Sequence, residues 1–350
     1  LVAMSIPAAQ TGQAGCEPAG DYGFVCGIPN AEDLVHVPGT QWIIASSLTP
    51  AGLFLIDSQA KRFTALYPGA APRAVQDMAT FGACPGSPDP NRFVTHGLAL
   101  RPGADGRFTL SVVGHGEREA IEVFDVDACG ETPVLTWRGC VLTPDGMAAN
   151  SVAALADGSL LVTIPLLTDV PIAEAMMGVD TGGVFRWSPG DAAMVPVQGT
   201  QLPYANGIEV SADGREFYVA SSGLFHVTAY SNTDPAEVLR RTAEFGFVPD
   251  NLHMGADGRL ITAGLDLHGT ACGEFERSLE FSLEAFAACP RPFTVVAIDP
   301  ATMQVEVLAT GPANPKFSNI TLALEVDDEL WIGSFASDRI AYRARCSIAC

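Results

Sequence analysis

The sequence predicts an all-β fold, a six-bladed β-propeller with four-stranded blades, from three observations. Short apolar runs recur along the 350 residues and are often closed by Asp-Gly pairs, which favour tight β-hairpin turns. The resulting unit recurs six times, and each copy offers about four strands, the content of a propeller blade. The 35 glycines and 25 prolines favour turn-rich structure. A two-sheet β-sandwich or two small β domains would not explain six similar units.

The units can be followed in order along the chain. The first begins at Glu32 and the last near residue 320, and the intervals between unit starts vary from 45 to about 69 residues, which indicates insertions between strands. The starts of the other four units are His96, Asn150, Asn206 and Asn251. Their hairpin turns are expected at 105–106, 157–158, 213–214 and 257–258, and an Asp-Gly pair at 145–146 gives the same signal. Further strands are expected at 121–125, 183–187, 227–230 and 295–299.

Two insertions look helical, and the ring must also close. Residues 171–178 begin with Pro and end with Gly, as helices often do, and residues 272–289 bracket a second helical segment between two cysteines. A disulfide from Cys26 to Cys346 or Cys350 would join the two ends in one blade. We expect residues 1–20 to form an N-terminal extension and residues 21–350 to form a single propeller domain.

Charge and cysteine content restrict the partners and the compartment. A formal net charge of -21 repels nucleic-acid backbones and anionic membrane surfaces, and no stretch reaches 18 uninterrupted apolar residues, so a membrane span is not expected. The nine cysteines lack zinc-site spacing, and several adjoin Gly or Pro at loop edges. They indicate disulfides and a secreted or periplasmic protein, with at least one thiol left over; buried free thiols in the cytosol are the alternative.

The residues that open the units are polar where a propeller places the mouth of its central channel. This position carries carboxylate or amide side chains in most units, and the set is Glu32, Asn150, Asn206, Asp250 and Asn251. Oxygen ligands around one axis suit a hard cation, so we expect calcium. A single Asn before Gly or Ser is usually a turn residue. Its recurrence at one position of the unit favours the metal.

Two histidines accompany these oxygens. His96 opens the second unit and His115 follows in the same unit, so adjacent antiparallel strands could bring both rings to one end of the channel. Such a pair can relay a proton near neutral pH. The other histidines have no comparable context and are expected at surface or packing positions: His36, His226, His253 and His268.

Several of these segments resemble motifs of the paraoxonase/arylesterase lactonases, within the wider superfamily of gluconolactonase and senescence-marker-type propellers. The resemblance spans about residues 26–345 and is carried by residues 31–34, 95–97, 114–115, 150–152, 206–214 and 249–251. It implies a six-bladed propeller that hydrolyses lactones, aryl esters and in some members organophosphate triesters. It further implies a catalytic calcium on the five oxygen residues above and a catalytic dyad of His96 and His115.

The same resemblance implies a second, structural calcium held by Asp33 and the Leu98 position. The family places an Asp after the first Asn ligand, whereas this chain has Ser151. The second ion is therefore an open alternative.

Taken together, the sequence predicts a calcium-dependent hydrolase of lactones and aryl esters, with a small-molecule substrate and a pocket wall from residues 172–177 and 272–289. Three alternatives remain at this point. One is a gluconolactonase-type sugar lactonase, and another is a non-catalytic propeller that calcium stiffens and whose rim binds a protein. The third, a strictosidine-synthase-like propeller without metal chemistry, leaves the oxygen residues unexplained.

Overall fold

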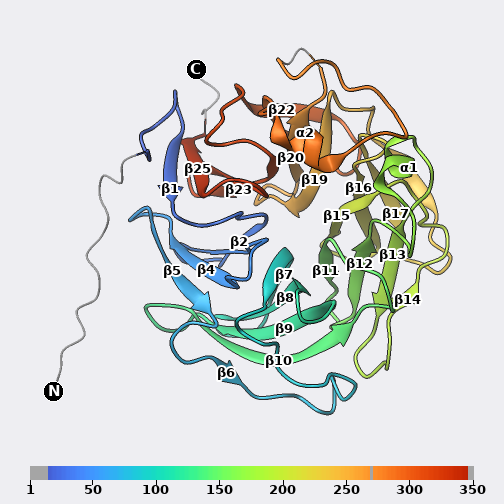
Figure 1. Ribbon diagram of the computed structural model, residues 1–350. Coiled ribbons are helices and arrows are strands. Elements are labelled where there is room, and N and C mark those ends of the chain that lie inside the picture. The colour runs from blue at the N-terminus through green and yellow to red at the C-terminus, as the bar shows by residue number, and fades with distance from the viewer. Residues whose placement is uncertain (1–14, 269–270, 346–350) are drawn as a thin grey trace.

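The computed structural model describes residues 15–268 and 271–345, and it confirms the all-β, six-bladed propeller. Six sheets stand in a ring around a central axis, with β2, β7, β11, β15, β19 and β23 nearest the centre (Figure 1). Five sheets have four strands, and the second blade gains the short strand β6, which runs parallel to β10.

Within each blade the strands follow in chain order from the axis outward, except that β6 is added outside β10 in blade two and the N-terminal β1 is the outer strand of blade six. Blade one comprises β2 (Leu34–His36), β3 (Trp42–Ala45), β4 (Leu53–Asp57) and β5 (Arg62–Tyr67). Blade two comprises β7 (Val94–Pro102), β8 (Arg107–His115), β9 (Ala120–Asp127), β10 (Val134–Leu142) and β6 (Arg73–Ala74). Blade three comprises β11 (Val152–Ala154), β12 (Leu160–Ile164), β13 (Gly183–Trp187) and β14 (Val195–Pro196). Blade four comprises β15 (Ala205–Val210), β16 (Glu216–Ser221), β17 (His226–Ser231) and β18 (Val238–Arg241). Blade five comprises β19 (Phe247–Met254), β20 (Leu260–Asp266), β21 (Phe293–Ile298) and β22 (Val305–Gly311). Blade six comprises β23 (Ile320–Val326), β24 (Glu329–Ser334), β25 (Arg339–Ala344) and β1 (Gly23–Cys26).

The Asp-Gly pairs form turns because their glycines adopt positive φ angles, which side chains disfavour. Four of them, at Gly106, Gly158, Gly214 and Gly258, join the two innermost strands of a blade as predicted. The fifth prediction was wrong. Gly146 also has a positive φ, but it lies in the connection from β10 to β11, which leads from one blade to the next.

Apolar side chains hold the ring together at the contacts between neighbouring blades. One buried cluster joins blade six to blade one through Leu34, Ile43, Leu322 and Trp331, and five further clusters fill the other blade contacts. Because each of these clusters combines side chains from two neighbouring blades, the units cannot bury their apolar surface alone.

The ring closes through backbone pairing rather than through the predicted disulfide. β1 from the N-terminal part pairs antiparallel with β25 from the C-terminal part, in register Gly23 to Tyr342 (Figure 1). Cys26 bonds Cys16, ten residues away, so the prediction of a bond from Cys26 to Cys346 or Cys350 was wrong. The latter two cysteines lie outside the described residues.

Two more disulfides involve the cysteines that adjoin Gly or Pro at loop edges, as predicted for all of them except Cys129. Cys84 bonds Cys140, and Cys272 bonds Cys289, while Cys129 is an exposed free thiol. Three disulfides fit a protein of an oxidising, extracellular environment. Within the described ranges, no helix combines the length and apolar character needed to cross a bilayer.

The two insertions contain short helices. α1 (Ile172–Met176) follows Pro171 and ends before Gly178, as predicted. In the 272–289 insertion only α2 (Leu283–Ala288) is helical, so the prediction was too long. The rings of Phe275, Phe281 and Phe286 pack against one another, and a continuous helix would turn Phe275 and Phe281 to different faces.

His226 offers a test of the packing in blade four. It is buried on β17, and burial first, with Arg241 second, lowers its pKa to about 4. The folded protein thus keeps this ring neutral, whereas the unfolded chain protonates it below about pH 6.5. As pH falls from about 6.5 to 4, this residue alone should remove about 3 kcal/mol from the free energy of unfolding. Urea unfolding at saturating calcium should show that His226→Gln loses less stability than wild type across this window. Parallel pH curves would contradict the assignment.

Candidate functional site

The candidate site lies at one end of the central axis, where the innermost strands carry irregularities. One extra residue interrupts the pairing of β7 with β8, of β15 with β16 and of β19 with β20. These bulges contain His96, Asn206 and the pair Asp250-Asn251. A β-bulge redirects side chains out of the regular alternation. Glu32 and Asn150 precede β2 and β11 by two residues and bring their side chains to the same cavity.

Two glycines allow the channel strands to approach one another closely. A Cβ atom on Gly97 would lie 2.6 Å from the Asn150 backbone oxygen, and one on Gly207 would lie 2.5 Å from the Asp250 backbone oxygen. Real Cβ atoms do not tolerate such contacts. The glycines after His96 and Asn206 therefore bring neighbouring blades together at the site.

Four buried oxygens of the predicted set have no hydrogen-bond partner: Glu32 Oε2, Asn150 Oδ1, Asn206 Oδ1 and Asn251 Oδ1. Two of the amide nitrogens have hydrogen-bond partners. Asn251 Nδ2 donates to Glu32 Oε1 at 2.6 Å, and Asn206 Nδ2 donates to Ser222 Oγ at 2.9 Å. Buried polar atoms are normally paired, and leaving one unpaired costs about 1–3 kcal/mol. A cation that coordinates several oxygens at once would satisfy all four.

The charges at this end of the channel call for a cation. Glu32 is 1% exposed, and burial raises its pKa well above the usual range, with repulsion from Asp33 as the next cause. Burial also raises the pKa of Asp250 well above its usual range, and Glu32 adds to this effect. A divalent cation would balance these two carboxylates, and its preference for carboxylate and amide oxygens matches calcium.

The residues present thus fit one calcium ion, with Glu32, Asn150, Asn206, Asp250 and Asn251 as the side chains that would hold it. The described residues contain no group of three or more His, Cys, Asp or Glu side chains arranged as a metal site. The proposed ligands do not form a group of that kind, because three of the five are asparagine side chains.

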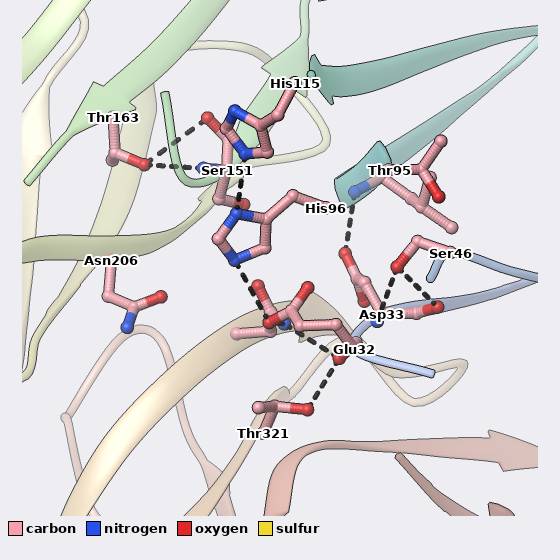
Figure 2. A network of polar contacts seen from close by, with 12 residues as sticks. Glu32, Asp33, Ser46, Thr95, His96, His115, Ser151, Thr163, Asn206 and Thr321 are labelled. Atoms are coloured by element: carbon pink, nitrogen blue, oxygen red, sulfur yellow. Dashed lines mark hydrogen bonds and ion pairs between the residues drawn. The ribbon is translucent and has the colours of Figure 1, made fainter. Parts of the chain in front are cut away.

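His96 and His115 form the predicted pair. His96 Nδ1 lies 3.1 Å from His115 Nε2, and His96 Nε2 lies 3.5 Å from Glu32 Oε1 (Figure 2). Burial lowers the pKa of His96, although Asp250 and Asp33 oppose that shift. A neutral ring between a buried carboxylate and a second imidazole can accept a proton.

The positions implied for a second calcium are arranged differently. Asp33 Oδ1 accepts hydrogen bonds from the Leu34 N–H at 2.8 Å and from His253 Nε2 at 2.6 Å, and Asp33 Oδ2 accepts from the Leu98 N–H at 2.7 Å. Burial lowers the pKa of His253, but Asp33 outweighs it and the pKa rises to about 9. An imidazolium therefore neutralises Asp33, and these residues do not fit a second cation.

His253 is the main residue of this region that the sequence analysis missed. It was expected at a surface or packing position, whereas its side chain is 14% exposed and pairs with Asp33. Its position two residues after Asn251 could have signalled this, because residues i and i+2 of a strand share a face. Thr321 was also missed; its hydroxyl donates to the Glu32 backbone oxygen at 2.6 Å. The other histidines behave as expected: His226 packs inside blade four, and the His268 side chain is 63% exposed.

A cavity of about 160 Å³ opens above the oxygens, and its wall is mostly apolar. The two insertions supply much of this wall, through Ile172, Met176, Phe275, Phe281, Leu283 and Phe286. Arg277 holds them together, since its Nη1 donates to the Met176 backbone oxygen at 2.6 Å and to the Gly223 backbone oxygen at 2.7 Å. A wider hollow of about 520 Å³ lies beside His115 and shares His96 and Asn150 with the cavity.

Comparisons with known proteins agree with this architecture. The family model described as the SMP-30/Gluconolactonase/LRE-like region matches residues 52–276. A comparison with curated proteins gives no match.

Among solved structures the chain is similar to a luciferin-regenerating enzyme, with 15% identity, 93% of this chain and 94% of that chain covered, and a TM-score of 0.56. It is also similar to a gluconolactonase from Xanthomonas campestris (15%, 93% and 89%, TM-score 0.53) and to regucalcin, a calcium-binding protein from Agrobacterium tumefaciens (12%, 92% and 92%, TM-score 0.53). At these identities the likeness shows the fold alone. The family model, in contrast, matches well over half of the residues, and the chain therefore belongs to the SMP-30/gluconolactonase/LRE-like family.

Proposed function

We propose that this protein is a secreted or periplasmic, calcium-dependent hydrolase of apolar lactones and aryl esters, in the manner of the paraoxonase/arylesterase lactonases. The observation that carries the proposal is the set of four unpartnered buried oxygens beside a histidine pair. In a non-catalytic propeller, these oxygens would bind a calcium ion that stiffens the channel. A neutral His96 facing the same cavity would then have no role.

The cavity wall supports an apolar acyl or aryl group as the part of the substrate that is recognised. Phe275, Phe281 and Phe286 present aromatic rings, and Ile172 and Met176 present aliphatic surface. Burying such a group stabilises the complex by about 25 cal/mol for each Å² of apolar surface removed from water. A polyhydroxylated sugar lactone would leave its hydroxyls without partners against this wall.

When bound, calcium supplies Lewis-acid polarisation of the ester carbonyl. The chain's own residues supply the base: His96 Nε2 takes a proton from water while the water oxygen adds to the carbonyl carbon. His115 accepts the His96 Nδ1 proton across the 3.1 Å contact and so spreads the charge. The ester C–O bond then breaks, and the leaving oxygen receives the proton. The apolar wall keeps bulk water away from these steps.

A panel of substrates tests the proposal. We expect purified protein to hydrolyse γ- and δ-lactones with alkyl chains and phenyl acetate, to act weakly on organophosphate triesters, and to lose all three activities with a chelator. Calcium should restore them. A calcium-loaded, folded protein that hydrolyses no ester would contradict the proposal and favour a binding propeller. Activity that ignores the chelator would contradict the role of calcium.

A gluconolactonase-type sugar lactonase is the second candidate, and family membership favours it. The same panel separates the two, because a sugar lactonase should prefer gluconolactone to an alkyl lactone of equal ring size. The apolar wall predicts the opposite order.

A further inference from the structure

Glu119 stands behind the histidine pair, on the far side of His115 from His96. Its Oε2 atom lies 2.5 Å from His115 Nδ1, which completes a chain from Glu119 through His115 and His96 toward Glu32. We propose that Glu119 is a positioning residue that fixes the tautomer of His115 and thereby determines which nitrogen of His96 is free to act as the base. This inference rests on the proposed function of the site.

The fold holds Glu119 in place through the turn that joins β8 to β9. Gly116 has a φ of 103°, and a Cβ atom there would lie 2.0 Å from the Arg92 backbone oxygen, so the chain turns tightly after His115. The backbone oxygen of Glu119 accepts hydrogen bonds from the Thr143 N–H at 3.1 Å and from the Thr143 hydroxyl at 3.3 Å. These backbone contacts hold the segment that brings the Glu119 carboxylate to His115 Nδ1.

The two other charged residues of this turn have partners elsewhere. Arg118 pairs with the buried Glu122 at 2.7 Å, and Glu117 Oε2 accepts a hydrogen bond from the Asp89 N–H at 2.8 Å. Glu119 is therefore the residue of this turn whose carboxylate faces His115.

Hydrogen-bond chemistry then assigns the protons along the chain. An ionised carboxylate only accepts, so His115 Nδ1 carries the proton that it donates to Glu119. In a neutral ring the other nitrogen is an acceptor, so His115 Nε2 accepts from His96 Nδ1. His96 Nε2 is left with a lone pair on the side of the cavity, where the proposed base must be. Without the Glu119 carboxylate, both rings could reverse and His96 Nε2 would carry a hydrogen.

Steady-state kinetics of three variants test the proposal. Glu119→Leu removes the acceptor, and we expect it to lower kcat for an alkyl lactone about 10- to 100-fold, the size typical of losing a partner that orients a functional histidine. KM and calcium affinity should stay within about twofold, because Glu119 lies outside the calcium ligands and the apolar wall. Glu119→Gln retains an oxygen that can accept and should recover part of the loss. Glu117→Leu, two residues away on the same turn, is the matched control and should behave as wild type.

Nitrogen NMR of protein labelled at its six histidines provides a readout independent of activity. The His115 ring, identified by its loss in His115→Gln, should show Nε2 unprotonated in wild type and a mixture of tautomers in Glu119→Leu. An unchanged His115 spectrum in Glu119→Leu, or kinetics equal to those of Glu117→Leu, would overturn the inference. If wild type hydrolysed no ester, the proposed function would be wrong. The nitrogen NMR spectrum of His115 would still decide whether Glu119 sets the tautomer of that ring.

Discussion

Asn206→Ala is expected to lower lactone hydrolysis by about 100- to 1,000-fold at a fixed, limiting calcium concentration, the range found when one electrostatic stabiliser of a reacting carbonyl oxygen is removed. The variant deletes one of the four unpartnered oxygens and leaves Ser222 without its donor. Calcium titration by calorimetry should show weaker binding, and high calcium should restore part of the activity.

The same titration counts the ions. Because His253 neutralises Asp33, wild type should bind one calcium per chain rather than two. Asn232→Ala is a matched control, since this half-buried amide of blade four donates to the Gly214 backbone oxygen and accepts from Arg186, away from the cavity. It should leave calcium affinity unchanged. Unaltered calcium affinity in Asn206→Ala would refute the assignment of the ligands, and a stoichiometry of two would restore the second site.

His96→Gln is expected to lower kcat for lactones by about 100- to 10,000-fold, which is the usual contribution of a general base. Glutamine retains a hydrogen-bonding group toward His115 but cannot accept the proton from water. Calcium affinity should change little, because the five proposed ligands remain, and KM should change less than kcat. Stopped-flow and steady-state assays with one lactone and phenyl acetate would measure both parameters.

His36→Gln is the control for that substitution. Its ring lies 2.6 Å from the Thr40 backbone oxygen on blade one, outside the cavity with the calcium ligands, so activity should be retained. If His96→Gln kept full lactonase activity, the base assignment would be wrong, and water activation would fall to Asp250. If His96→Gln lost activity toward only one of the two substrates, the histidine pair would act in the hydrolysis of that substrate alone.

The sequence alone determined the fold because the information is local and repeated. An Asp-Gly turn between two apolar strands specifies a hairpin within about fifteen residues, and six copies of such a unit must stack to bury their apolar faces. The proposed calcium ligands could be selected from the sequence for the same reason. They recur at one position of the repeated unit. Because the six units form a ring, residues at that position of different units meet at the propeller axis.

Tertiary structure alone decided the contacts that cross between blades or depend on irregular backbone. The bulges that redirect Asn206 and Asp250 into the cavity arise from strand pairing and leave no local pattern in the sequence. His253 meets Asp33 across 220 residues of chain, and Asn251 meets Glu32 across 219, because the first and fifth blades both reach the axis. Glu119 reaches His115 only through a tight turn held by Thr143. Pairing of this kind depends on distances that appear only when the ring has closed. The closure itself is the pairing of β1 with β25, whereas Cys26 forms a local bond with Cys16.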